Sequence, residues 1–61
     1  MKQTSEQMSI ENLAKIEHRE GDVHEALIFD HARKYYGTVN DDTIRSVWDD
    51  IYHYQEYVMG I

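Results

Sequence analysis

The chain has 61 residues, with twelve acidic and six basic side chains, and it contains no cysteine and no proline. A chain of this length forms one small domain at most, and the missing cysteines exclude disulfides and thiolate metal sites. The net charge of −6 argues against direct binding to nucleic acid, because such binding relies on neutralising phosphates. No apolar run is long enough to span a membrane, and the first residues lack the apolar region of a secretory signal, so we expect a cytoplasmic protein.

The first residues are polar, and we expect residues 1–8 to form a flexible N-terminal segment before a single helical domain over residues 9–61. Ser9 is the predicted N-cap of a first helix over residues 10–20. Its apolar side is short and weak, and it consists of Ile10, Leu13, Ala14 and Ile16.

A second helix is predicted over residues 23–36, after a sharp corner at Gly21–Asp22. Asp22 and Glu25 have the spacing of a capping box, and Gly37 suits the left-handed position that follows a helix. The apolar arc of this helix is wider than one buried face requires, which indicates contacts from two directions. That arc includes His24, Leu27, Ile28, His31 and Tyr35.

The third predicted helix covers residues 41–59, with Asn40 or Asp41 as its N-cap and Gly60 after its end. Trp48 lies on its apolar stripe and is the predicted packing anchor, so that Trp48→Ala should cost about 3–5 kcal/mol. The stripe has helical spacing throughout and consists of Ile44, Val47, Trp48, Ile51, Gln55 and Val58.

The sequence therefore predicts an all-α fold of three helices with short loops. The second and third helices carry more apolar surface than the short first helix can cover, so we expect a dimeric helical bundle. A compact monomeric bundle is the alternative. The residues expected in the core or the dimer interface are Leu27, Ile28, Tyr35, Ile44, Val47, Trp48, Ile51 and Val58.

The polar side of the third helix is the candidate partner-binding site. Asp49 and Asp50 lie four and three residues before His53, and Tyr57 lies four residues after it, so these side chains can converge. General-base catalysis there would need a nucleophile and a pocket, and a convex helix face supplies neither. We instead expect tyrosine and carboxylate groups to contact a basic or nucleic-acid-binding protein. The alternative is a solvated face. The candidate residues are Tyr36, Asp49, Asp50, His53, Glu56 and Tyr57.

Two other kinds of site are possible in this sequence. A metal site would use His18, His24, His31 or His53, but His24 and His31 are about 10.5 Å apart along one helix, and no metal motif is present. We therefore expect no native metal or cofactor. A nucleic-acid-binding module would use three basic residues. A DNA mimic would use the acidic residues of the third helix together with Glu11, Glu17, Glu20 and Asp22, although Arg45 interrupts the acidic surface. The three basic residues are Lys15, Arg33 and Lys34.

The combined expectation is a small, acidic, non-enzymatic interaction protein that acts as a regulator, inhibitor or adaptor. In size and composition the chain resembles small accessory proteins of phages and mobile elements, and it carries no motif of a known family.

Overall fold

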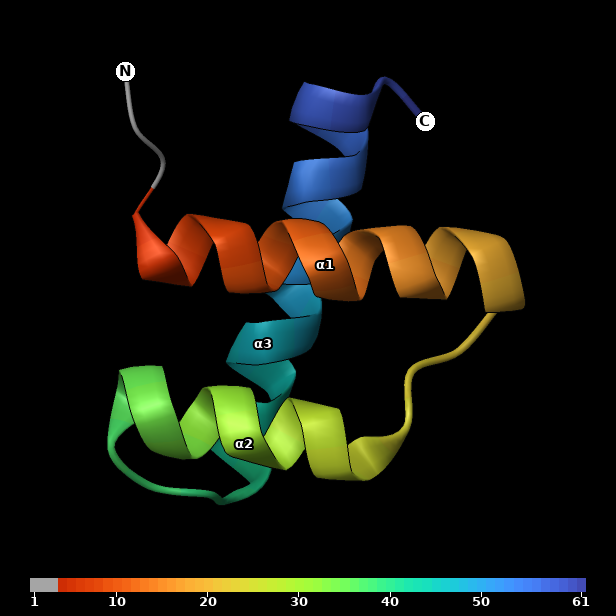
Figure 1. The fold of residues 1–61 in the computed structure, drawn as a ribbon. Helices are drawn as coiled ribbons and strands as arrows, with labels where there is room; N and C mark the ends of the chain where they lie inside the picture. The colour runs from red at the N-terminus through yellow and green to blue at the C-terminus, as the bar shows by residue number, and fades with distance from the viewer. Residues whose placement is uncertain (1–3) are drawn as a thin grey trace.

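A computed structural model describes residues 4–61, which form three α-helices and a terminal π-helical turn (Figure 1). The helices are α1 (Ser5–Glu20), α2 (Glu25–Tyr36) and α3 (Asp41–Tyr54), and the π-helical turn η1 (Gln55–Met59) continues α3. No strand occurs within residues 4–61, so the predicted all-α fold of three helices is confirmed. None of these helices combines the length and apolar content needed to cross a membrane.

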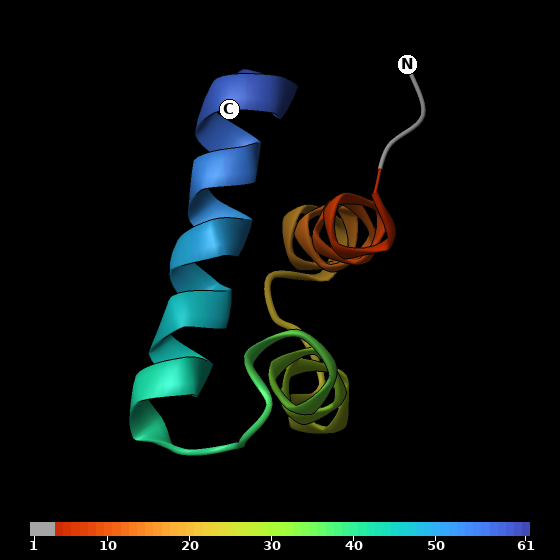
Figure 2. The ribbon, with the colours of Figure 1, turned by 90° about the vertical axis from the view of Figure 1, so that its left-hand side faces the viewer.

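The helices form two layers. Helices α1 and α2 run antiparallel in one layer, and α3 crosses both of them on the same face (Figures 1 and 2). The molecule is accordingly flat, with extents of 29 × 29 × 15 Å. The apolar core lies between the layers and consists of Ile10, Leu13, Ala14, Val23, Ile28, Ala32, Val47 and Ile51.

Helix α1 begins at Ser5, five residues earlier than predicted. Its N-cap is Thr4, whose hydroxyl accepts from the Gln7 backbone N–H at 3.1 Å, while the Gln7 side chain accepts from the Thr4 N–H at 3.0 Å. This capping box satisfies two of the backbone donors at the helix start. Residues 5–8, predicted to be flexible, are therefore helical, and residues 1–3 of that segment lie outside the described residues.

Helix α2 begins two residues later than predicted. His24 is its N-cap, with Nδ1 accepting from the Ala26 N–H at 3.1 Å. The predicted cap, Asp22, instead accepts from the Val23 N–H at 2.8 Å and holds the corner between α1 and α2. As predicted, Gly37 ends the helix in the left-handed region, with φ of 82°.

Helix α3 begins as predicted, with Asn40 forming a capping box with Thr43. It ends differently, because η1 widens the last turn. A π-helical turn contains one residue more than an α-helical turn, so the residue one turn beyond Gln55 is Met59. Met59 packs against the core, while Val58, predicted on the apolar stripe, is 65% exposed.

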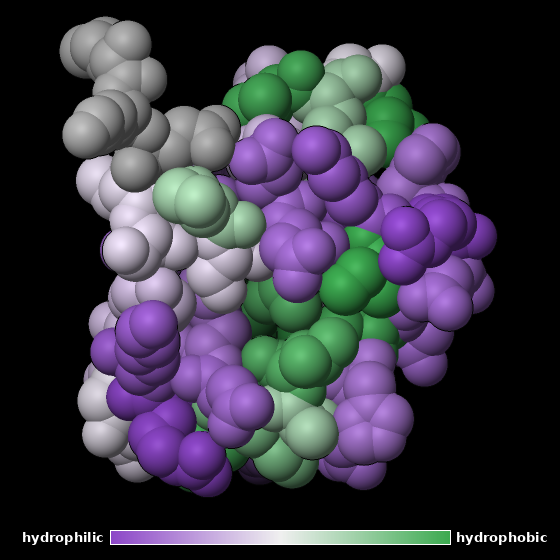
Figure 3. All heavy atoms as spheres, viewed as in Figure 1, coloured by the Kyte–Doolittle hydropathy of each residue, from purple (hydrophilic) through white to green (hydrophobic). Residues whose placement is uncertain are grey.

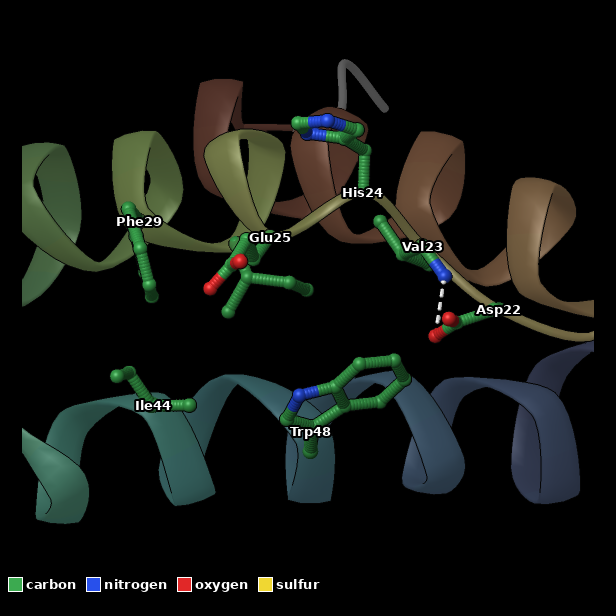
Figure 4. A pocket seen from close by; sticks show the side chains of 8 residues that line it. Asp22, Val23, His24, Glu25, Phe29, Ile44 and Trp48 are labelled. Atoms are coloured by element: carbon green, nitrogen blue, oxygen red, sulfur yellow. Dashed lines mark hydrogen bonds between the residues drawn. The ribbon is translucent and has the colours of Figure 1, made fainter.

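The other residues predicted for the core or the dimer interface differ in burial. Ile28, Val47 and Ile51 are fully buried within one chain. Ile44 and Trp48 pack against this core but remain partly exposed, and they line an open hollow between the start of α2 and α3 (Figure 4). Tyr35 is also partly buried.

The outer face of α1 and α2 carries a hydrophobic furrow (Figure 3). Leu27, which is 40% exposed, lines this furrow together with Met8 and Tyr35. Hydrophilic side chains flank the apolar strip (Figure 3). The exposed apolar side chains therefore do not form one continuous surface, because Val58 lines a different hollow from the one that Leu27 lines.

Candidate functional site

The predicted partner-binding residues of α2, α3 and η1 form a largely exposed surface, which we call the acidic tyrosine patch: Tyr36, Asp49, Asp50, His53, Glu56 and Tyr57. Asp49, His53 and Glu56 are exposed. Tyr57 is 76% exposed, and its ring lies against the ring of His53 with 5.9 Å between the centroids. Helical spacing places a flat aromatic ring among carboxylates on this surface.

Two members of the patch connect α2 to α3. The Tyr36 hydroxyl donates to Asp50 Oδ2 at 2.5 Å. This hydrogen bond, together with burial, raises the pKa of Tyr36 to about 12. Asp50 is consequently half-buried and oriented by the tyrosine, whereas Asp49 beside it faces solvent. The separation of 14 positions between Tyr36 and Asp50, on two different helices, explains why helix periodicity alone did not pair them.

Beside the patch lies an open hollow of about 400 Å³. The sequence predicted a convex face without a pocket, because it did not place α1 next to this part of α3. The start of α1 forms one wall with Glu6, Gln7 and Ile10. The remaining lining residues are Tyr36, Asp50, His53, Tyr54, Tyr57 and Val58.

A second group of polar side chains lies where the three helices meet, and we call it the Glu6–His31–Asp50 cluster. One ring nitrogen of His31 and one carboxylate oxygen each of Glu6 and Asp50 lie within 4.8 Å of one another. His31 is only 3% exposed, and this burial lowers its pKa, although the nearby carboxylates partly oppose the shift. Its Nδ1 lies 2.7 Å from Ser9 Oγ.

The four histidines occupy very different environments. His18, His24 and His53 are exposed, and His24 serves as the cap of α2. Within residues 4–61, His31 is the histidine that groups with two carboxylates in a geometry able to hold a metal ion. The sequence placed His31 on the apolar arc but could not identify Glu6 and Asp50 as its neighbours, since they come from two other helices.

The Ser9–His31 pair has two of the groups of a nucleophilic site. Ser9 lies inside α1, where backbone N–H groups are engaged in the helix and cannot stabilise an oxyanion. His31 Nε2 also has no hydrogen-bond partner within residues 4–61, so no carboxylate orients the ring as a catalytic base requires. The pair therefore lacks the arrangement of an acyl-transfer centre.

The basic residues considered for phosphate binding have partners within the chain. Lys15 Nζ lies 3.1 Å from Glu11 Oε1, and Arg33 Nη1 lies 3.3 Å from Asp30 Oδ1. Lys34 Nζ lies over the ring of Tyr35, 5.4 Å from its centroid. These neighbours reduce the positive potential that a phosphate backbone would meet.

Comparison with protein-family models, with curated proteins and with solved structures finds no match to this chain.

Proposed function

We propose that this protein is a small, non-enzymatic binding protein that recognises a basic surface of another protein through the acidic tyrosine patch. The observation that carries the proposal is the exposure of Tyr57, at 76%, beside Asp49, His53 and Glu56. An exposed tyrosine offers large contact area at low entropic cost, and its ring face also attracts arginine and lysine side chains.

Charge supports the same kind of partner. Residues 41–59 carry five acidic side chains and one basic side chain, Arg45. Complementary charge accelerates encounter and selects against wrong partners, while aromatic contacts supply much of the affinity. A basic or nucleic-acid-binding protein is the partner that suits this combination of charge and aromatic surface. By binding such a partner, the protein would act as a regulator, an inhibitor or an adaptor.

A variant that removes the exposed part of the patch tests the proposal. We expect Asp49→Asn, Glu56→Gln and Tyr57→Ala together to lower the affinity for the partner about tenfold or more, because a contact tyrosine and two charges are lost. The tagged wild-type chain would first be used to capture its partner from the host. The affinity of each variant for the purified partner would then be measured by calorimetry.

The matched control removes the same groups elsewhere. Glu20→Gln, Asp30→Asn and Tyr52→Ala also remove two carboxylates and one exposed tyrosine, and this variant is expected to bind the partner as the wild type does. Unchanged affinity in the patch variant would contradict the proposal. A large drop in its melting temperature would show instead that the patch is structural.

Self-association is a second part of the proposal. The buried faces of α2 and α3 pack on each other within one chain, so a homodimer would use the furrow between α1 and α2. We expect Leu27→Asp to convert a dimer to a monomer in sedimentation velocity, because it places a charge in that furrow. Val58→Asp, in a different hollow, should leave the dimer intact. A wild-type chain that sediments as a monomer would remove this part of the proposal.

A further inference from the structure

The starting point is a buried nitrogen without a partner. His31 is 3% exposed, and its Nε2 has no hydrogen-bond partner within residues 4–61. A buried polar group left without a hydrogen-bond partner destabilises a folded protein. Because Nδ1 is engaged by Ser9, Nε2 is the ring nitrogen that remains for a ligand.

The surroundings of the His31 ring indicate a cation. Glu6 comes from the first turn of α1, His31 from α2 and Asp50 from α3, and their ligand atoms lie within 4.8 Å of one another. Ligand atoms at about 2.0–2.2 Å from a metal ion lie about 3–4 Å apart. The side chain of Glu6 is exposed and can close the remaining distance by rotation. The start of α1 and the end of α2 lie on the same side of the molecule (Figure 2).

The neighbouring hydrogen bonds would orient two of the ligands. When Nδ1 carries the ring proton, it donates to Ser9 Oγ and leaves the lone pair of Nε2 for a metal. Tyr36 donates to Asp50 Oδ2, which holds that carboxylate in place and leaves Oδ1 for the ion. Histidine and carboxylate ligands in metal sites are commonly fixed in this way by a second layer of hydrogen bonds.

We propose that Glu6, His31 and Asp50 form a binding site for a divalent transition-metal ion. One imidazole nitrogen and two carboxylate oxygens suit Zn²⁺ or Mn²⁺, whereas Mg²⁺ and Ca²⁺ prefer oxygen ligands alone. Water from the adjacent hollow would complete the coordination. With one ligand from each helix, the ion would join all three helices in a chain that has no disulfide.

Titration of the full chain with ZnCl₂, followed by calorimetry, tests the site. We expect one Zn²⁺ per chain and a higher melting temperature in its presence, because an ion that binds only the folded chain stabilises it. Glu6→Gln and Asp50→Asn should each weaken binding about 100-fold or more, and His31→Gln should abolish it. Ser9→Ala should weaken it about 10- to 100-fold.

Two controls separate this site from surface binding. Glu20→Gln removes a carboxylate elsewhere on α1, and His18→Gln removes an exposed histidine away from the site, so both should bind Zn²⁺ as the wild type does. Because Glu6 is exposed, Glu6→Gln should fold as the wild type does. Its affinity for Zn²⁺ therefore tests the site even if His31→Gln fails to fold. The ring ¹⁵N resonances of His31 should be the first histidine signals to shift on adding Zn²⁺.

Absence of binding to both Zn²⁺ and Mn²⁺ would overturn the proposal. Wild-type affinity in Glu6→Gln and Asp50→Asn would do so as well, as would loss of binding in His18→Gln. The titration needs no protein partner, and the variant that tests partner binding changes Asp49, Glu56 and Tyr57 but none of the three proposed metal ligands. The metal site and the proposed partner binding can therefore fail independently of each other.

Discussion

Replacing Ile51 with alanine is expected to destabilise the protein by about 2–5 kcal/mol. Ile51 is 0% exposed and, with Ile28 and Val47, is among the largest fully buried side chains. The flat two-layer molecule cannot readily collapse around the missing atoms, because α3 contacts both α1 and α2. A 61-residue domain has a total stability of about 3–9 kcal/mol, so the variant should lose much of it. Urea unfolding followed by circular dichroism measures the change.

Val58→Ala is the matched control for Ile51→Ala. Ile51 and Val58 are seven residues apart and would share one face of an uninterrupted α-helix. Because η1 turns Val58 outward, Val58→Ala should change the free energy of unfolding by about 0.5 kcal/mol or less. Equal losses in the two variants would mean that the α-helical register continues to the end of the chain.

Gln55→Ala is expected to cost about 2–3 kcal/mol, because it removes two hydrogen bonds and a buried side chain. The Gln55 side-chain amide donates to the Ala14 carbonyl at 3.1 Å and to Glu17 Oε1 at 2.7 Å. These bonds join η1 to α1 across 41 and 38 residues of sequence. Thermal and urea unfolding of the variant measure the loss.

Two further substitutions check the role of Gln55. Glu56→Ala alters an exposed neighbour and should change the stability by about 0.5 kcal/mol or less. Glu17→Gln keeps an acceptor for the Gln55 amide and should cost less than Gln55→Ala. If Gln55→Ala were as mild as Glu56→Ala, the attachment of η1 to α1 would not depend on these bonds.

The helix ends show what short-range patterns predict well. Gly21, Gly37 and Gly60 all end helices with positive φ angles, as predicted, because glycine adopts this conformation without a Cβ clash. The start of α1 was predicted wrongly, although its capping box, Thr4 with Gln7, is present in the sequence. Few apolar residues follow that pattern directly, whereas Ser9 precedes Ile10, so apolar periodicity places the start of the helix too late.

The core shows where helical periodicity stops being informative. Helical periodicity identified the buried faces of α2 and α3 and predicted Trp48 as the packing anchor. Trp48 does pack against the core, but the largest fully buried side chains are Ile28, Val47 and Ile51. Trp48 lies at the edge of the α2–α3 contact, stacked on Tyr52 with 5.9 Å between ring centroids. Periodicity defines a face of a helix, but the crossing point of the neighbouring helices selects which residues of that face are enclosed.

Helix caps and apolar faces depend on residues within about four positions of one another, so they can be derived from the amino-acid sequence of this chain. The Glu6–His31–Asp50 cluster, the Tyr36–Asp50 hydrogen bond and the attachment of Gln55 to α1 join residues from different helices. These contacts exist because α3 crosses α1 and α2 at one particular position and rotation. That arrangement results from the packing of the three helices together, and no local pattern in the chain encodes it.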